Sequence, residues 1–215
     1  MFEAIEFFQL RSFWYFLTGT IWSPGVANSQ FGALPIFAGT FVITIIALLV
    51  AIPIGLGSAI YMSEYASPKF RDYLKPILEI LAGIPTVVYG FFAAITVAPL
   101  VVKAAAFFGL EATFNSALAS GIVMGIMIIP LISSLSDDVI RAVPDSQRKA
   151  AFALGMTHGE TIKNIVIPSA MPGIISASLL ALSRALGETM IVVMAAGLRP
   201  NLSWNPLEDM TTVTV

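Results

Sequence analysis

Long uncharged stretches alternate with short charged segments along most of this chain. No charged side chain occurs between Ser12 and Ser63, for example, and that stretch is mainly apolar. About 20 apolar residues are enough to cross the roughly 30 Å hydrocarbon core of a bilayer. The pattern therefore predicts four membrane-spanning helices, at about residues 37–62, 80–102, 112–135 and 171–198.

The composition favours an all-α, polytopic membrane protein. Of the 215 residues, 57% are hydrophobic and only 11% are charged, whereas about a quarter of the residues in a soluble domain are charged. The net charge of -2 offers no basic excess for nucleic acid. With no cysteine and one histidine, His158, we expect no metal site. A GxxxxGK[ST] phosphate loop is also missing, so we expect no ATP site and no catalytic residues in this chain.

Residues 1–36 precede the membrane domain, which we assign to residues 37–215. Phe13 to Phe16 form an aromatic cluster of the kind found at lipid headgroups. We therefore expect residues 1–36 to be an extracytoplasmic or interfacial segment. They lack the basic region that begins a signal peptide. The chain stops after Val215 without a polar tail, and we expect a fragment that lacks spans at both ends.

The positive charges are distributed unevenly between the two sides of this topology. The segments 63–79 and 136–163 share one side and hold seven of the eleven Lys and Arg residues, against three on the other side. The positive-inside rule places those two segments in the cytoplasm. Within the first of them, Ser67 followed by Pro68 predicts the start of a helix.

The longest polar stretch lies within residues 136–168, and its spacing predicts two short helices joined by a turn. Ala150 and Ala151 permit close approach on one helix face, and Gly155 permits a sharp turn. Pro168 is expected to end the second helix and turn the chain toward the membrane. The spacing fits a docking site for another protein and an ordinary structured loop equally well.

Arg184 and Glu188 lie near the middle of the fourth predicted span. A charge at that depth costs about 3 kcal/mol on insertion scales, and such residues usually face a bundle interior or a water-filled path. Four residues apart on a helix, the two would share a face and could pair, although this order of charges is the less favourable one. The residues alone leave a structural pair and a substrate path equally open.

The polar stretch resembles the EAA loop in the membrane subunits of ABC importers, whose short coupling helix fits a cleft on the ATPase subunit. The matching positions are Ala150, Ala151, Gly155, Ile165 and Pro168. Lys149 departs from the pattern, because many members have an acidic residue or glutamine there. The resemblance implies that these five positions contact the ATPase, and we add His158, for which a polar loop favours an interfacial role.

Residues 184–190, Arg-Ala-Leu-Gly-Glu-Thr-Met, are similar to a stretch of the PstC-type phosphate permease subunits of ABC importers. Further similar stretches extend over nearly the whole chain from about Thr18, at residues 31–35, 59–65, 81–85, 88–91 and 205–212. The resemblance implies the type I ABC importer permease (MetI-like) helical bundle. It also implies phosphate transport, with Arg184 and Glu188 in the substrate path, and Thr189 adds a hydroxyl beside them.

The same resemblance implies the partners and the compartment. These are a PstA-like second permease subunit, ATP-binding ABC subunits, an extracytoplasmic phosphate-binding protein, and the lipid of the bacterial plasma (inner) membrane. ATP would be used by the partner subunits, and this chain would bind no cofactor. We therefore expect a multi-pass permease subunit of an ATP-driven phosphate importer that forms half of the translocation path.

We hypothesise an exchange in which Arg184 pairs with Glu188 in the closed state and turns partly to phosphate during transit. A guanidinium suits this role, since its planar fork of donors can contact two oxygens at once. Two alternative functions remain, a permease for another oxyanion such as molybdate or sulfate, and a non-transporting membrane scaffold or sensor.

Overall fold

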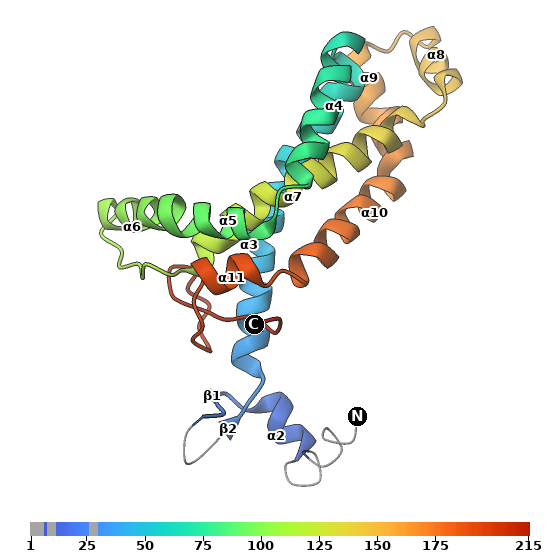
Figure 1. Ribbon diagram of the computed structural model, residues 1–215. Coiled ribbons are helices and arrows are strands. Elements are labelled where there is room, and N and C mark those ends of the chain that lie inside the picture. Colours follow the sequence, from blue (N-terminus) through green and yellow to red (C-terminus); the bar gives the residue numbers. More distant parts are fainter. Residues whose placement is uncertain (1–6, 8–11, 26–29) are drawn as a thin grey trace. The chain divides into compact units, whose positions relative to one another are not determined.

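The computed structural model describes residues 7, 12–25 and 30–215, which are mainly helical (Figure 1). Among them are four helical segments that are long and apolar enough to cross a membrane. These segments are Leu34–Tyr65, Thr86–Phe107, Ala117–Arg141 and His158–Leu186. The predicted all-α class with four candidate spans is therefore confirmed. The expected interfacial segment 1–36 falls partly outside the described residues.

The chain divides into two compact units, each built from separated segments. The first comprises Met1–Ile46, Thr86–Val123 and Leu186–Val215, and the second comprises Ala47–Pro85 and Met124–Ala185. The elements in chain order are α2 (Phe13–Thr18), β1 (Trp22–Ser23), β2 (Gln30–Phe31), α3 (Leu34–Ile60), π-helix η1 (Tyr61–Tyr65), α4 (Pro68–Ala82), α5 (Thr86–Phe92), π-helix η2 (Ala93–Val97), α6 (Ala98–Phe107), α7 (Ala117–Arg141), α8 (Asp145–Ala153), α9 (His158–Thr161), π-helix η3 (Ile162–Val166), α10 (Ile167–Leu186) and α11 (Met190–Ala195).

In the first unit, small residues allow helices and backbone to approach closely. Helix α11 packs on α5 at Gly90, where an added Cβ would lie 2.7 Å from the sulfur of Met194. At Gly39 on α3, an added Cβ would lie 2.1 Å from the backbone oxygen of Thr211. Residues 210–212 are buried there. The C-terminal segment therefore forms part of the packed unit.

The second unit has its core where α3, α7, η3 and α10 meet. The buried cluster consists of Ala59, Ile140, Val143, Val166, Ala170 and Ile174. Gly173 on α10 faces Val139 on α7, and an added Cβ would lie 2.2 Å from a Val139 methyl group. Small residues at helix contacts are typical of membrane bundles, because lipid offers no hydrophobic force between helices and close packing must hold them together.

Ion pairs fasten helix α4 to the end of α7 in this unit. The guanidinium of Arg71 donates to Asp137 at 2.9 Å, and the ammonium of Lys75 donates to Asp138. The Asp137 side chain is almost fully buried, at 1% exposed. The predicted start of α4 is confirmed, since the Ser67 hydroxyl accepts a hydrogen bond from the Phe70 N–H and Pro68 occupies the first helical turn.

The helix boundaries differ from the uncharged stretches that predicted them. The second spanning helix begins at Thr86 rather than near residue 80, because α4 ends at Ala82 and the segment 83–85, which contains a glycine and a proline, separates the two. The third runs from Ala117 to Arg141 rather than from 112 to 135. Its polar last turns remain helical because Asp137 and Asp138 find partners on α4.

We expect Gly125→Ala to destabilise the fold by about 1–3 kcal/mol through overpacking. An added Cβ at Gly125 on α7 would lie 2.8 Å from Val50 Cβ and 2.9 Å from the Ala47 carbonyl oxygen on α3. The matched control is Gly57→Ala, which has open space around it and gains helix propensity. Thermal unfolding in detergent should show a lower Tm for the first variant only, and equal Tm values would contradict this packing.

Candidate coupling surface and substrate path

Helix α8, the turn after it and helix α9, which begins the fourth candidate span, form a helix–turn–helix. Gly155 has a φ of 82°, in the left-handed region that favours glycine. Its N–H donates to the Phe152 carbonyl at 2.9 Å, and the Met156 N–H donates to the Ala151 carbonyl at 3.2 Å. These two bonds form a Schellman motif, which satisfies carbonyls that would otherwise be left free at the end of α8.

Helix α9 begins with a capping box directly after this turn. The Thr157 hydroxyl accepts from the Glu160 N–H, and the Glu160 carboxylate accepts from the Thr157 N–H at 2.8 Å. Two N–H groups at the helix start are thereby satisfied. The angle between α8 and α9 is thus fixed by local hydrogen bonds on both sides of Gly155, as the sequence spacing predicts.

A groove of about 530 Å³ lies between α8 and the η3–α10 segment, and we name it the docking groove. It is lined by Gln147, Ala150, Ala151, Leu154, Met156, Asn164, Ile165, Pro168 and Ser169. Four of the six positions expected to contact the ATPase therefore lie around one concavity, and Gly155 forms the turn at its side. Leu154 in this lining is 84% exposed.

Pro168 does not end a helix, contrary to the sequence prediction. It lies in the first turn of α10, within a continuous helical run from His158 to Leu186. The preceding segment η3 is π-helical, and the Ile167 N–H bonds to the carbonyl of Ile162 rather than that of Lys163. This wider turn accommodates the proline ring, which would clash in a regular α-helix.

His158 is not among the residues that line the docking groove, and it is held by other neighbours. Its ring stacks on Phe152 of α8, with centroids 6.3 Å apart, and meets the edge of Tyr65 of η1 at 5.4 Å. Its Nε2 lies 3.3 Å from the Glu64 carbonyl oxygen. The histidine therefore joins α9 to α8 and η1, and the sequence had not indicated the last of these contacts.

A second anchor of α8, which the sequence did not reveal, is the ion pair between Arg148 and Glu64. One guanidinium nitrogen of Arg148 lies 2.6 and 2.7 Å from the two carboxylate oxygens. Another donates to the Ile140 carbonyl at 2.9 Å. Glu64 is distant in sequence, so no local pattern could have identified this pair.

Glu188 belongs to a break between helices rather than to the middle of one. Helix α10 ends at Leu186 and α11 begins at Met190, so the fourth span does not continue to residue 198. The Glu188 carboxylate accepts from the N–H groups of Met190 and Ile191, at 3.2 and 3.4 Å. The side chain is thus committed to starting α11, and glycine at position 187 weakens the helix before it.

The predicted shared helix face of Arg184 and Glu188 is therefore wrong. Arg184 lies in the last turn of α10 and is exposed, whereas Glu188 is buried beyond the end of that helix. The argument that a spacing of four residues makes them neighbours holds only for a continuous helix.

A network of threonine hydroxyls surrounds the break, and sequence reasoning identified only one of its members. The Thr214 hydroxyl donates to the Glu188 carbonyl at 2.8 Å and lies 2.9 Å from the Thr212 hydroxyl. The Thr189 hydroxyl donates to the Thr214 carbonyl, and the Thr40 hydroxyl accepts from the Val213 N–H. Thr189 therefore helps hold the C-terminal segment against the break.

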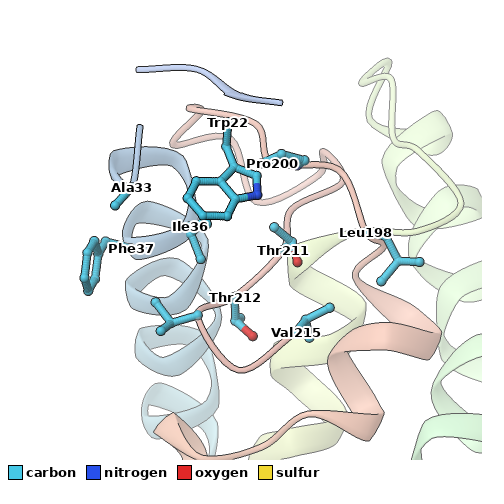
Figure 2. Close-up of a pocket in the computed structure, with 10 residues that line it drawn as sticks. Trp22, Ala33, Ile36, Phe37, Leu198, Pro200, Thr211, Thr212 and Val215 are labelled. Carbon is cyan, nitrogen blue, oxygen red and sulfur yellow. The ribbon is translucent and has the colours of Figure 1, made fainter. Parts of the chain in front are cut away.

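The first unit also contains a pocket of about 530 Å³ beside this segment (Figure 2). Figure 2 shows Trp22, side chains from the start of α3 and residues from the 198–215 segment around it. Its lining is Trp22, Ala33, Ile36, Phe37, Leu198, Pro200, Thr211, Thr212, Val213 and Val215. No charged residue is in this set, so the pocket does not support the predicted anion path.

Together these features define a multi-pass helical membrane protein with a grooved helix–turn–helix at the start of its fourth candidate span. Residues 51–200 match the binding-protein-dependent transport system inner membrane component family, and the chain belongs to this family. The chain is 37% identical over 199 residues to a probable ABC transporter permease protein, YqgH, of Bacillus subtilis (strain 168), covering 93% of this chain and 63% of that protein.

Other relatives carry a more specific name. Over 224 residues the chain is 34% identical to phosphate transport system permease protein PstC 1 of Mycobacterium tuberculosis (strain ATCC 25618 / H37Rv), covering 91% of this chain and 66% of that protein. A PstC of Mesorhizobium japonicum (strain LMG 29417 / CECT 9101 / MAFF 303099) is 35% identical over 214 residues, with 93% and 65% covered. The chain thus corresponds to 63–66% of the length of these relatives.

Solved structures support the fold. An amino acid ABC transporter with histidines matches with a TM-score of 0.53 at 20% identity, covering 79% of this chain and 74% of that chain. The MetNI methionine ABC transporter matches with a TM-score of 0.54 at 19% identity, covering 77% and 74%. The MetI-type permease bundle expected from the sequence is therefore confirmed.

We expect Gly155→Ala to destabilise the turn between α8 and α9, because a Cβ in the left-handed region costs about 1–2 kcal/mol. Gly159→Ala is the matched control, since Gly159 has open space around it and lies within α9. Hydrogen–deuterium exchange of residues 150–157 should be faster in the first variant and unchanged in the control. Equal exchange in both variants would contradict the role of Gly155.

Proposed function

We propose that this chain is the membrane permease subunit of an ATP-driven inorganic phosphate importer and forms half of its translocation path. The observation that carries the proposal is the docking groove, in which the residues matching an EAA loop gather around one concavity. The substrate assignment is supported by the relatives named as phosphate permeases and by the Arg184 stretch. ATP would be hydrolysed by separate subunits, and this chain would bind no cofactor.

The docking groove is suited to receive part of an ATPase subunit. It combines small lining side chains, such as Ala150 and Ala151, with the exposed Leu154. An exposed apolar side chain beside a concave, preformed surface is typical of an interaction site. Lys149 is exposed on the same helix, and its positive charge would favour an acidic partner residue.

Arg184 is the residue we propose for phosphate contact. It is exposed on α10, whereas Glu188 is held by the start of α11. A guanidinium can offer two parallel donors to one phosphate group. Since the carboxylate already accepts backbone hydrogen bonds, we revise the exchange hypothesis. Arg184 would bind the anion without first leaving Glu188, and Glu188 and Thr189 would shape the break next to the path.

The remaining partners follow from the family. A PstA-like second permease subunit would complete the path, and an extracytoplasmic phosphate-binding protein would deliver substrate. The positive charges of segments 63–79 and 136–163 would place the docking groove in the cytoplasm of a bacterium, with the chain in the plasma membrane. Membrane lipid would surround the exposed apolar side chains of the spans.

Two other functions can be separated from this one by uptake measurements. Molybdate and sulfate are also oxyanions. If the chain belonged to a permease for either of them, an excess of that anion would lower the uptake of labelled phosphate by competition. A scaffold or sensor would show no ATP-dependent uptake at all. Reconstituted vesicles that contain the complete transporter distinguish these cases.

We expect Arg184→Gln to lower ATP-dependent phosphate uptake by at least tenfold, because neutral glutamine removes the charge and the paired donors. Arg184→Lys keeps the charge without the planar fork and should retain part of the activity. Uptake into reconstituted vesicles measures the effect, and co-purification of the partner subunits checks assembly. Uptake at the wild-type rate in Arg184→Gln would rule out Arg184 as the phosphate contact.

We expect Ala150→Glu to weaken binding of the ATPase subunit by about tenfold or more, equivalent to about 1.4 kcal/mol. The larger charged side chain would occupy part of the docking groove, which Ala150 lines. Ser146→Glu adds the same charge to α8 outside the groove and serves as control. Affinity measured on the detergent-purified permease should fall for the first variant only, and an equal loss in both would argue against the groove as the contact.

A further inference from the structure

Movement at the docking groove can reach α10 directly, because η3 and α10 line part of the groove, and the contacts of α8 offer a second route to other spanning helices. The turns at both ends of α8 are short, and its C-terminal turn is closed by local hydrogen bonds that do not reach another span. Gln147 of α8 accepts a hydrogen bond from the Ser169 hydroxyl of α10, and Arg148 connects α8 to two further spanning segments. Its partner Glu64 lies in η1, which continues directly from the end of α3.

The geometry of this contact is that of a buried, multiply bonded pair. The Glu64 side chain is only 3% exposed and the Arg148 side chain 18% exposed. One nitrogen of Arg148 reaches both carboxylate oxygens, at 2.6 and 2.7 Å, while a second bonds to the Ile140 carbonyl near the end of α7. A single side chain of α8 thus connects the ends of two spanning helices.

The surroundings of the pair limit the positions that Arg148 can take. Asp145 is the other carboxylate near it, at 3.9 Å, but its side chain is 85% exposed. An exposed ion pair of this length contributes little. Removing one partner from a buried pair is costly because the other charge is left uncompensated. The His158 ring adds a further contact at the Glu64 carbonyl, so η1 is held by both α8 and α9.

The π-helical form of η1 places Glu64 for this contact. A π-helical turn inserts one extra residue into the helical repeat and changes which side chains share a face, and such turns are frequent at functional sites. Met62 of η1 is buried toward the unit, while Tyr61 and Tyr65 remain more than half exposed. The Glu64 side chain is 3% exposed and contacts Arg148 of α8.

We propose that Glu64 and Arg148 are positioning residues that transmit movement between the docking groove and the ends of α3 and α7. The pair holds α8 to η1 and to the last turns of α7, so that α8 and these helix ends move together. The proposal rests on the proposed function for the identity of the ATPase partner. The proposal predicts that breaking the pair uncouples ATP hydrolysis from transport.

The test uses the complete transporter reconstituted in vesicles, with ATP hydrolysis and phosphate uptake measured in the same preparation. We expect Glu64→Gln and Arg148→Gln each to lower the uptake per ATP hydrolysed by about tenfold, while the ATPase subunits still co-purify and still hydrolyse ATP. The double variant should be no worse than either single variant, because both remove the same link. Arg148→Lys should restore part of the ratio.

Lys75→Gln provides the matched control, because it breaks an ion pair of the same unit, between α4 and α7, that does not involve α8. Its ratio of uptake to hydrolysis should remain that of the wild type.

An unchanged ratio in Glu64→Gln and Arg148→Gln would overturn the proposal, and so would additive losses in the double variant. Parallel loss of subunit binding and hydrolysis would also overturn it, as the pair would then only support folding. A wild-type chain that takes up another anion would refute the phosphate assignment, yet the ratio could still be measured with that anion.

Discussion

The structure depends on one constraint: every interruption of a helix leaves backbone N–H and C=O groups that need partners, and within a bilayer only the protein itself can supply them. Two interruptions show how this chain meets it. Around Gly155, a Schellman motif and a capping box close the turn with local bonds. Between α10 and α11, the Glu188 carboxylate supplies acceptors for the N–H groups of the next helix, and the Thr214 hydroxyl bonds to the Glu188 carbonyl. Gly155 lies in the first of these interruptions, Glu188 and Thr189 lie in the second, and Arg184 lies in the helical turn before it.

The spans and the start of α4 could be predicted because their signals are local. An uncharged stretch identifies residues that prefer lipid, and Ser67 with Pro68 identifies a helix start. The helix ends could not be predicted in the same way, because hydrophobicity indicates which residues lie in the membrane, whereas a helix can extend beyond them. Helix α7 continues to Arg141 because its Asp137 and Asp138 pair with residues of α4. The sequence near these aspartates does not indicate partners that lie far away in the chain.

The same difference between local and long-range signals applies to the candidate site. The spacing of Ala150, Ala151 and Gly155 predicted the helix–turn–helix, because its hydrogen bonds connect residues that are close in sequence. The Glu64–Arg148 pair and the threonine network could not be found, because they join distant segments. Pro168 shows the opposite error, in which a strong local signal for a helix end was overridden by the π-helical turn before it.

The break after Leu186 has a mechanical consequence for the proposed function. One helical run from His158 to Leu186 carries the docking groove near its start and Arg184 near its end. At about 1.5 Å per residue, this run could carry a movement at the groove across most of a bilayer. Glu188 lies beyond the break and is tied to α11, so it need not follow the same movement. In the proposed transport cycle, the separation between the arginine and the carboxylate would be free to change, whereas the continuous helix predicted from the sequence would hold it constant.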